Sequence, residues 1–281
     1  MKMGKEMNDQ DIKNAVKEGY SRVARNASSC CGSGCCSSAK PVSISKKIGY
    51  TDEQMRSVPE GANLGLGCGN PIALASLKEG EAVLDLGSGA GFDCFLASNA
   101  VGPQGRVIGV DMTEEMLVRA KANAKKGGYG NVEFRLGEIE ALPVEDNFVD
   151  AIISNCVINL VPDKKKAFRE AFRVLRPGGR LMVSDIVLKK KLPDSVLQSI
   201  EAYVGCVAGA VTKEKYLDAI SSAGFEDVQL IEEVDFPLDC MVADPHGKAI
   251  LKSLDDSVEE IKRVEGFISS IKVSGRKPVK R

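Results

Sequence analysis

One short stretch, residues 81–91 (EAVLDLGSGAG), constrains the fold more than any other part of the chain. The apolar run over residues 82–86 is typical of a buried parallel strand. The run ends at three glycines on alternate positions, Gly87, Gly89 and Gly91. A helix is predicted to begin at Phe92. A strand, a glycine turn and a helix in this order place a ligand at the carboxyl end of a parallel sheet, where doubly wound folds open their crevice.

Predicted strands and helices alternate beyond this stretch, which is the pattern of an α/β fold with a doubly wound, mostly parallel sheet. Strands are predicted at residues 82–86, 106–110, 132–136, 148–153 and 179–184, with helices at 92–101, 114–125, 164–175 and 194–202. After residue 203, helices at 213–223 and 246–262 and strands at 226–232 and 267–274 complete a seven-stranded sheet or cover it. An N-terminal extension carries an amphipathic helix over residues 9–24 and loops, and the C-terminal addition is α+β.

Charge and hydropathy favour a small-molecule ligand. The formal net charge is −1, so no basic face is available for nucleic acid. The first 20 residues are polar without the apolar region of a signal peptide, and no stretch approaches the roughly 18 apolar residues of a membrane span. We therefore expect a cytoplasmic monomer that binds neither nucleic acid nor a membrane.

The chain has nine cysteines and one histidine. Thiols are kept reduced in the cytoplasm, so the cysteines are expected to bind a ligand or to cycle in redox chemistry. His246 follows an Asp-Pro pair, and we expect it in a solvated loop. Without another histidine, a Ser-His-Asp hydrolase and a histidine-ligated zinc enzyme are both disfavoured.

Residues 28–38 (SSCCGSGCCSS) form a predicted flexible loop with two vicinal cysteine pairs. The four thiols belong to Cys30, Cys31, Cys35 and Cys36. A zinc or iron–sulfur site would need a contorted backbone, because neighbouring side chains of an extended chain point apart. Mobile thiols that exchange with other thiols, or capture a soft ion, fit the loop better, and metal storage remains the alternative.

The spacing of the glycines argues against a dinucleotide. The dinucleotide fingerprint has its third glycine three residues after the second, and that position is Phe92. An acidic Asp85 at the strand end instead suits a ligand with ammonium or sulfonium charge. Asp111 ends the second strand, where it can accept both hydroxyls of a ribose. Gly137 and Glu138 follow the third strand, where Glu138 is either placed to meet an adenine amine or is an ordinary surface acid.

Three segments together resemble the class I S-adenosylmethionine methyltransferases: DLGSGAG at 85–91, VDM at 110–112 and VLRPGG at 174–179. The resemblance covers about residues 70–190. It implies that Met112 lies against the adenine and Asp93 near the methionyl end of the cofactor. The predicted cofactor-binding residues are Asp85, Gly87, Ser88, Gly89, Gly91, Asp93, Asp111, Met112, Gly137, Glu138 and Asn155.

Three other cysteines suggest the methyl acceptor. Cys156 follows the fourth strand on the crevice side, and Cys68 and Cys206 each lie between small residues. A single cysteine in such a place is more often a small buried hydrophobe. Three thiols on three loops could, however, converge above the cofactor. Carbon and oxygen acceptors would need a base, whereas a thiophilic metalloid needs only thiols because its own lone pair is the nucleophile.

Three further segments resemble the arsenite methyltransferases: LGLGCGNP at 64–71, SNCVINLVPDK at 154–164 and YVGCVAGA at 203–210. The likeness runs from about residue 15 to the end. It implies that Cys156 and Cys206 bind trivalent arsenic, and that Cys68 joins in coordination or disulfide exchange. It also implies a relay thiol, an N-terminal cysteine that forms a disulfide with Cys68 and is then reduced by thioredoxin or glutathione; the four thiols in the loop at 28–38 are the candidates. Cys94 and Cys240 match no family thiol and are expected to be structural.

The predicted organisation has three parts: residues 1–70 with the N-terminal helix and Cys-rich loops, 71–190 as the cofactor-binding core, and 191–281 completing the sheet and the arsenic site. The predicted function is transfer of a methyl group from S-adenosylmethionine to arsenite, which is arsenic detoxification. Two alternatives stay open. One is a methyltransferase for an organic acceptor such as a quinone or sterol, and the other is a non-enzymatic thiol protein that sequesters metals.

Overall fold

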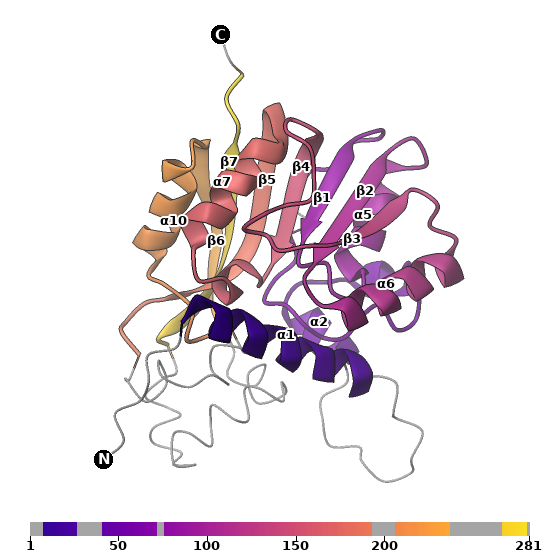
Figure 1. Ribbon diagram of the computed structural model, residues 1–281, viewed down its shortest axis with the longest axis horizontal. Helices are drawn as coiled ribbons and strands as arrows, with labels where there is room; N and C mark the ends of the chain where they lie inside the picture. Colours follow the sequence, from indigo (N-terminus) through magenta and orange to yellow (C-terminus); the bar gives the residue numbers. More distant parts are fainter. Residues whose placement is uncertain (1–7, 27–40, 72–75, 193–205, 237–265, 280–281) are drawn as a thin grey trace.

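A computed structural model describes residues 8–26, 41–71, 76–192, 206–236 and 266–279. Its centre is a seven-stranded sheet with the order β3-β2-β1-β4-β5-β7-β6 (Figure 1). The strands are β1 (Ala82–Leu86), β2 (Arg106–Asp111), β3 (Val132–Leu136), β4 (Val149–Asn155), β5 (Leu175–Leu188), β6 (Glu226–Asp235) and β7 (Ile268–Arg276). The first five are parallel, and β7 is antiparallel to both β5 and β6. The predicted doubly wound α/β fold with a mostly parallel sheet is confirmed.

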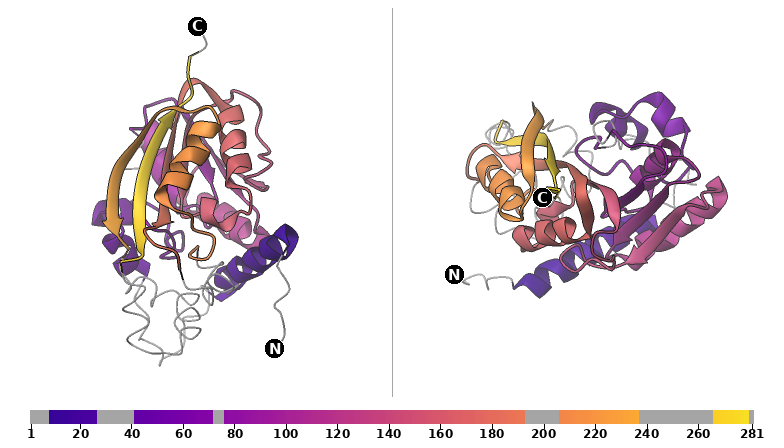
Figure 2. Two further views of the ribbon diagram at one scale, coloured as in Figure 1. Left: turned by 90° about the vertical axis from the view of Figure 1, so that its left-hand side faces the viewer. Right: turned by 90° about the horizontal axis from the view of Figure 1, so that it is seen from above.

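Helices cover both faces of the sheet (Figure 2). The described helices are α1 (Asp9–Asn26), α2 (Pro41–Lys47), α3 (Asp52–Arg56), α5 (Phe92–Val101), α6 (Glu114–Gly127), η1 (Ile158–Leu160), α7 (Lys164–Val174) and α10 (Lys213–Ser222). Apolar side chains of α5 and α6, such as Phe95 and Leu117, pack on one face with Val83 and Ile153. Phe168 of α7 and Tyr216 of α10 pack on the other face. The central strands β1, β2 and β4 are buried on both faces. Their sequences are therefore mostly continuous apolar runs, without the alternation of polar and apolar residues that a half-exposed strand shows.

The structure differs from the prediction at the start of β5. Residues 177–179 (PGG) are typical of a turn between the helix and the strand predicted on either side, yet β5 begins at Leu175 and its pairing with β4 shifts between Val149 and Ala151. Gly178 has a φ of +81°, and its N–H donates to the Lys277 carbonyl at 2.8 Å. The turn residues are thus drawn into the sheet by hydrogen bonds to the chain beyond β7, which no local pattern indicates.

Other predicted elements are found with ends that differ by up to three residues, or they lie outside the described residues. The strands at 82–86 and 132–136 and the helix at 92–101 have the predicted bounds. The predicted helices at 194–202 and 246–262, together with His246, lie outside the described residues, as does Cys240. Two short helices, α2 and α3, were not predicted; α3 begins with a capping box of Thr51 and Gln54.

Helix α1 crosses the edge of the sheet at the carboxyl ends of the parallel strands (Figure 1). Its Val16 is completely buried, and Ser21 donates a hydrogen bond to Glu115 of α6 at 2.8 Å. None of the helices in the described ranges has the length and apolar character that crossing a bilayer requires.

Candidate active site

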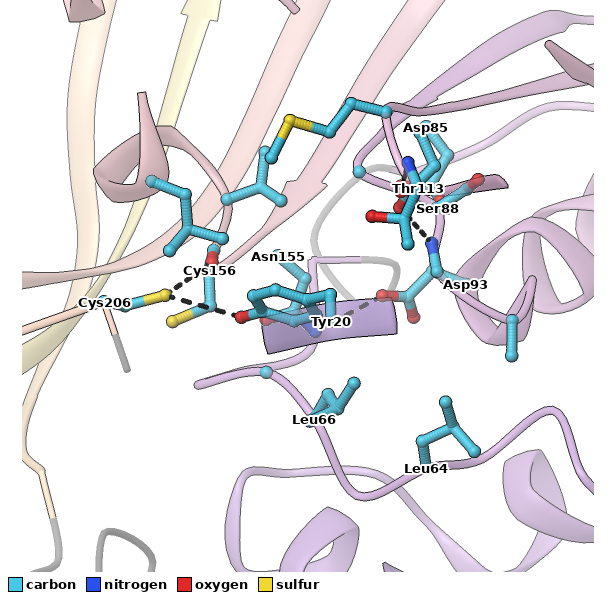
Figure 3. A pocket seen from close by; sticks show the side chains of 18 of the residues that line it. Tyr20, Leu64, Leu66, Asp85, Ser88, Asp93, Thr113, Asn155, Cys156 and Cys206 are labelled. Carbon is cyan, nitrogen blue, oxygen red and sulfur yellow. Dashed lines mark hydrogen bonds between the residues drawn. The ribbon is translucent and has the colours of Figure 1, made fainter. Parts of the chain in front are cut away.

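A crevice opens where α1 meets the ends of β1, β2, β3 and β4. Its walls come from the glycine turn after β1, from residues 62–67, and from residues that follow β2, β3 and β4. Figure 3 shows Asp85 and Ser88 at one end of this pocket and the thiols of Cys156 and Cys206 at the other. One cavity is therefore lined by cofactor candidates at one end and by two of the three singled-out thiols at the other.

Ten of the eleven predicted cofactor-binding residues line the crevice. They are Asp85, Gly87, Ser88, Gly89, Asp93, Asp111, Met112, Gly137, Glu138 and Asn155. Gly91 is not among the lining residues. A Cβ at that position would lie 2.8 Å from the ring of Phe95 and 2.9 Å from that of Phe134. Gly91 thus permits the turn to pack closely against Phe95 and Phe134, while neighbouring residues of the turn line the crevice.

The glycine turn after β1 is held in one shape by the protein itself. Gly87 has a φ of +70°, and a Cβ there would collide with Val157. The N–H of Gly89 donates to Oδ2 of Asp111 at 2.9 Å. Ser88 Oγ is buried and makes no hydrogen bond with the described part of the chain. A buried hydroxyl without a partner is costly, so this one is available for a ligand in the crevice.

Asp111 is positioned by backbone donors at the end of β2. Its Oδ1 accepts from the Thr113 N–H at 2.8 Å, in addition to the bond from Gly89. Burial raises the pKa of the Asp111 carboxyl, although these backbone hydrogen bonds oppose the rise. The carboxylate is therefore fixed in orientation and keeps lone pairs that face the crevice.

Two buried carboxyl groups, Asp85 and Asp93, lie at one end of the crevice. Burial raises the pKa of Asp85 well above its ordinary value, and the charge of Asp93 adds to the rise. Burial also raises the pKa of Asp93 to about 6, against a 2.6 Å hydrogen bond from the Tyr50 hydroxyl. A cationic ligand would stabilise both charged forms. Cys94 donates to Asp85 at 3.1 Å from the interior of α5, outside the crevice lining, as a structural thiol would.

Asn155, the last residue of β4, links the acidic end of the crevice to Cys68. Its Oδ1 accepts from the Cys68 N–H at 3.0 Å. Its Nδ2 donates to the Gly69 carbonyl at 2.8 Å and lies 3.3 Å from Oδ2 of Asp93. The amide thus accepts from one backbone group of the loop at 67–69 and donates to another, as a neighbouring strand does in a sheet. These two bonds hold Cys68 against the sheet.

The three predicted thiols meet at the other end. The Cys206 thiol donates to the Cys156 carbonyl at 3.0 Å, and the sulfurs of Cys68 and Cys156 lie within 4.8 Å of each other. Cys68 is buried behind the crevice wall, whereas Cys156 and Cys206 line it. Cys156 has a φ of +57° and Cys206 a φ of +64°. Such backbone strain costs about 1–3 kcal/mol per residue and is concentrated at functional sites.

All three thiols are held in the protonated form at neutral pH. Burial raises the pKa of Cys68. The hydrogen bond with Cys156, together with burial, raises the pKa of Cys206 well above its ordinary value. For Cys156, hydrogen bonding to Cys206 lowers the pKa, but hydrogen bonding to Cys68 and burial outweigh it. The thiols are therefore not activated in advance, and a ligand has to displace their protons.

Sequence reasoning missed four residues of the site. Lys13 pairs with Glu138 at 2.6 Å, and the Tyr20 hydroxyl lies 4.0 Å from the Cys206 sulfur, so α1 does more than pack. Tyr50 donates to Asp93, and Asp185 lies beside the thiols. Only Asp185 carried a signal, because an acid inside the apolar run LMVSDIVL has to find a partner.

The comparisons with known proteins agree with this geometry. A family model described as a methyltransferase domain matches residues 77–224. Together with the sheet order and the glycine turn, this match defines a class I methyltransferase. An arsenite methyltransferase of Halobacterium salinarum is 49% identical over 230 residues, which are 79% of this chain and 59% of the relative. The human arsenite methyltransferase is 32% identical over 235 residues, or 80% and 61%.

A solved structure is similar along most of its length. It is the X-ray crystal structure of CrArsM, an arsenic(III) S-adenosylmethionine methyltransferase from Chlamydomonas reinhardtii, with a TM-score of 0.61 and 32% identity. The match covers 86% of this chain and 74% of that one. The chain belongs to the arsenite methyltransferase family. It spans about three fifths of the length of the two curated relatives, at 59% and 61%.

Proposed function

We propose that the protein transfers a methyl group from S-adenosylmethionine to trivalent arsenic, which is held by Cys68, Cys156 and Cys206. The observation that carries this proposal is the position of Cys156 and Cys206, with Cys68 buried beside Cys156, at one end of a crevice whose other end holds two buried carboxyl groups. The thiols would bind a thiophilic acceptor, and the carboxyl groups would bind a cationic methyl donor in the same cavity.

The crevice fits the cofactor through its donors and acceptors. Asp85 and Asp93 would face the charged methionyl end, and the Asp111 carboxylate would accept from the ribose hydroxyls. The unpartnered Ser88 hydroxyl offers a further hydrogen bond. Met112, Gly137 and Glu138 would border the adenine. S-adenosylmethionine supplies, when bound, an electrophilic methyl group on a sulfonium.

The thiols would capture arsenic by exchange. Arsenite arrives as a thiol adduct, and each protein thiol replaces one leaving thiol, to which its proton passes, so the exchange needs no oxidant. The captured arsenic keeps a lone pair, which makes a general base unnecessary. The protein then contributes positioning, which can supply roughly 7–11 kcal/mol for a well-aligned pair.

Reduction of the arsenic product would use the N-terminal thiols. We propose that one of Cys30, Cys31, Cys35 and Cys36 forms a disulfide with Cys68, which thioredoxin or glutathione then resets. These four residues lie outside the described part of the chain. The biological role would be arsenic detoxification in the cytoplasm.

Mass spectrometry of arsenic species, after incubation with labelled S-adenosylmethionine, arsenite and a thiol reductant, tests this function. Labelled methylarsenicals are expected. Cys156→Ser and Cys206→Ser should each abolish them and leave S-adenosylmethionine binding intact in calorimetry, whereas Cys240→Ser should retain activity. A fully active Cys156→Ser enzyme would contradict the proposal. Labelled methyl transfer to an organic acceptor without arsenite would favour the quinone or sterol alternative.

A further inference from the structure

A carboxylate that the proposed reaction does not use lies beside two of the thiols. Asp185 of β5 is completely buried. One of its oxygens and the sulfurs of Cys68 and Cys156 all lie within 4.8 Å of one another. Aspartate is almost never fully buried unless it is paired. This carboxylate therefore requires groups that stabilise it or a ligand that it can bind.

The surroundings of Asp185 hold its carboxylate rigidly. Its Oδ1 accepts from Asn159 Nδ2 at 2.8 Å and from the Ile186 N–H at 2.9 Å. Its Oδ2 accepts from the Tyr216 hydroxyl at 3.0 Å. These bonds hold one carboxylate oxygen within 4.8 Å of both sulfurs. Hydrogen bonds of this kind are the usual outer support of a metal-ligating carboxylate.

We propose that Cys68, Cys156 and Asp185 form a binding site for a thiophilic divalent cation, such as Zn²⁺ or Cd²⁺. This site shares two thiols with the proposed arsenite site but does not require that function. A cation bound there would compete with arsenite. Asp185 would bind the divalent cation but not arsenic, and would therefore distinguish the two ions.

The ligand set suits a dication better than it suits arsenite. Trivalent arsenic with three thiolates is neutral and needs no carboxylate. Two thiolates and one carboxylate around a dication leave a charge of −1, and the charge of Lys164, which interacts with Asp185, would compensate for it. Ligands on a tetrahedral Zn²⁺ lie about 3.8 Å apart at a bond length of about 2.3 Å. Small side-chain movements would therefore close the set around the ion.

Binding involves no change of oxidation state. The cation forms two bonds to sulfur and one to oxygen, and the two thiol protons pass to the solvent. A water molecule would complete the tetrahedral coordination.

The test is a Cd²⁺ titration of the full-length chain with a non-thiol reductant. Cys30→Ser, Cys31→Ser, Cys35→Ser and Cys36→Ser are introduced first, so that the N-terminal thiols do not contribute. Calorimetry and the ultraviolet sulfur-to-cadmium band should show one bound ion. Adding Asp185→Asn should weaken Cd²⁺ binding at least about tenfold and leave arsenite affinity unchanged. Equal affinity for Cd²⁺, or an equal loss for both ions, would overturn the proposal.

A second variant keeps the test decisive if Asp185→Asn does not fold. Asp185→Cys replaces the oxygen ligand by sulfur, so the charge-transfer band at saturation should grow by about half as the sulfur ligands rise from two to three. An unchanged band would exclude residue 185 from the coordination shell. A chain that binds Cd²⁺ but not arsenite would refute the proposed function alone, and one that binds arsenite but not Cd²⁺ would refute this site alone.

Discussion

At the scale of the residue, the crevice is set by carboxyl groups that the fold keeps away from water. Asp93 is 8% exposed and Asp85 2%. Burial disfavours their charged forms, and a bound cation would restore them. Residue identity alone suggested acidic groups near a sulfonium, and the structure adds that their ionisation would be coupled to ligand binding.

This coupling predicts a pH dependence of cofactor affinity. The pKa of Asp93 is about 6, so the group is protonated below that pH and charged above it. A cationic cofactor binds the charged form, and the affinity should fall by up to about tenfold per pH unit below the pKa and level off above it. Calorimetry with S-adenosylmethionine from about pH 5 to about pH 8 measures this. Asp93→Asn should remove the step, and a step that persists in this variant would assign it to another group.

We predict that Asn155 contributes to arsenite affinity by holding Cys68 in position. Asn155→Leu keeps the side-chain size but removes the hydrogen bonds to Cys68 and Gly69. We expect the free energy of unfolding to fall by about 1–3 kcal/mol. Arsenite affinity should fall about tenfold or more if that stabilisation serves to position the thiol. Asn99→Leu, at an exposed position of α5 outside the crevice lining, is the control. Unchanged arsenite affinity in Asn155→Leu would show that Cys68 does not depend on this amide.

At the scale of the element, α1 closes the crevice from its open side. Lys13 pairs with Glu138 and Glu140 near the predicted adenine end, and Tyr20 approaches Cys206 at the thiol end. Hydrogen bonds to Glu138 and Glu140 raise the pKa of Lys13 even though burial opposes them. The amphipathic pattern indicated a helix that packs, but its position over both ends of the site depends on partners more than 100 residues away.

Removing the charge of Lys13 should loosen this helix. Lys13→Met keeps most of the apolar stem and abolishes both ion pairs, so we expect a loss of about 1 kcal/mol in the free energy of unfolding. Hydrogen exchange of the α1 amides should become faster. Lys17→Met is the matched control, because its pair with Glu114 is 3.6 Å long and exposed. Equal exchange rates in the two variants would contradict a closing role for Lys13.

At the scale of the whole molecule, the C-terminal residues are part of the same sheet as the crevice. Strand β7 lies between β5 and β6, and Ser270 of β7 donates to the Cys68 carbonyl at 2.7 Å. Tyr216 and Ile220 of α10 are completely buried against the sheet. We propose that residues 71–190 hold the cofactor, while 191–281 complete both the sheet and the thiol site.

A fragment of residues 71–190 is therefore expected not to fold alone. It would expose one edge of β5 and the apolar face that α10 covers, both of which are buried in the full chain. Circular dichroism during urea titration should show a cooperative transition for the full chain and none for the fragment. A sigmoidal transition of the fragment would establish 71–190 as an independent domain.

The amino-acid sequence by itself determined the elements of the fold and the candidate residues of the site. The strand, the glycine turn and the helix at 82–101 follow from the hydrophobic periodicity and from the positive φ angles that glycine readily adopts. Both signals are local, because they depend only on residues that are neighbours in the chain. The resemblance of the motifs around Cys68, Cys156 and Cys206 to those of arsenite methyltransferases identified the thiols, and ten of the eleven cofactor candidates do line the crevice. Their roles remain predictions.

Only the tertiary structure decided which of these residues meet. Asp185 lies beside two thiols, Lys13 pairs with Glu138 across 125 positions, and Ser270 reaches Cys68 across 202. The turn at 177–179 joins the sheet for the same reason, since its partner lies beyond β7. Such contacts depend on how sheets and helices pack, and the free energy of that packing belongs to the assembled core, which no local stretch of sequence encodes.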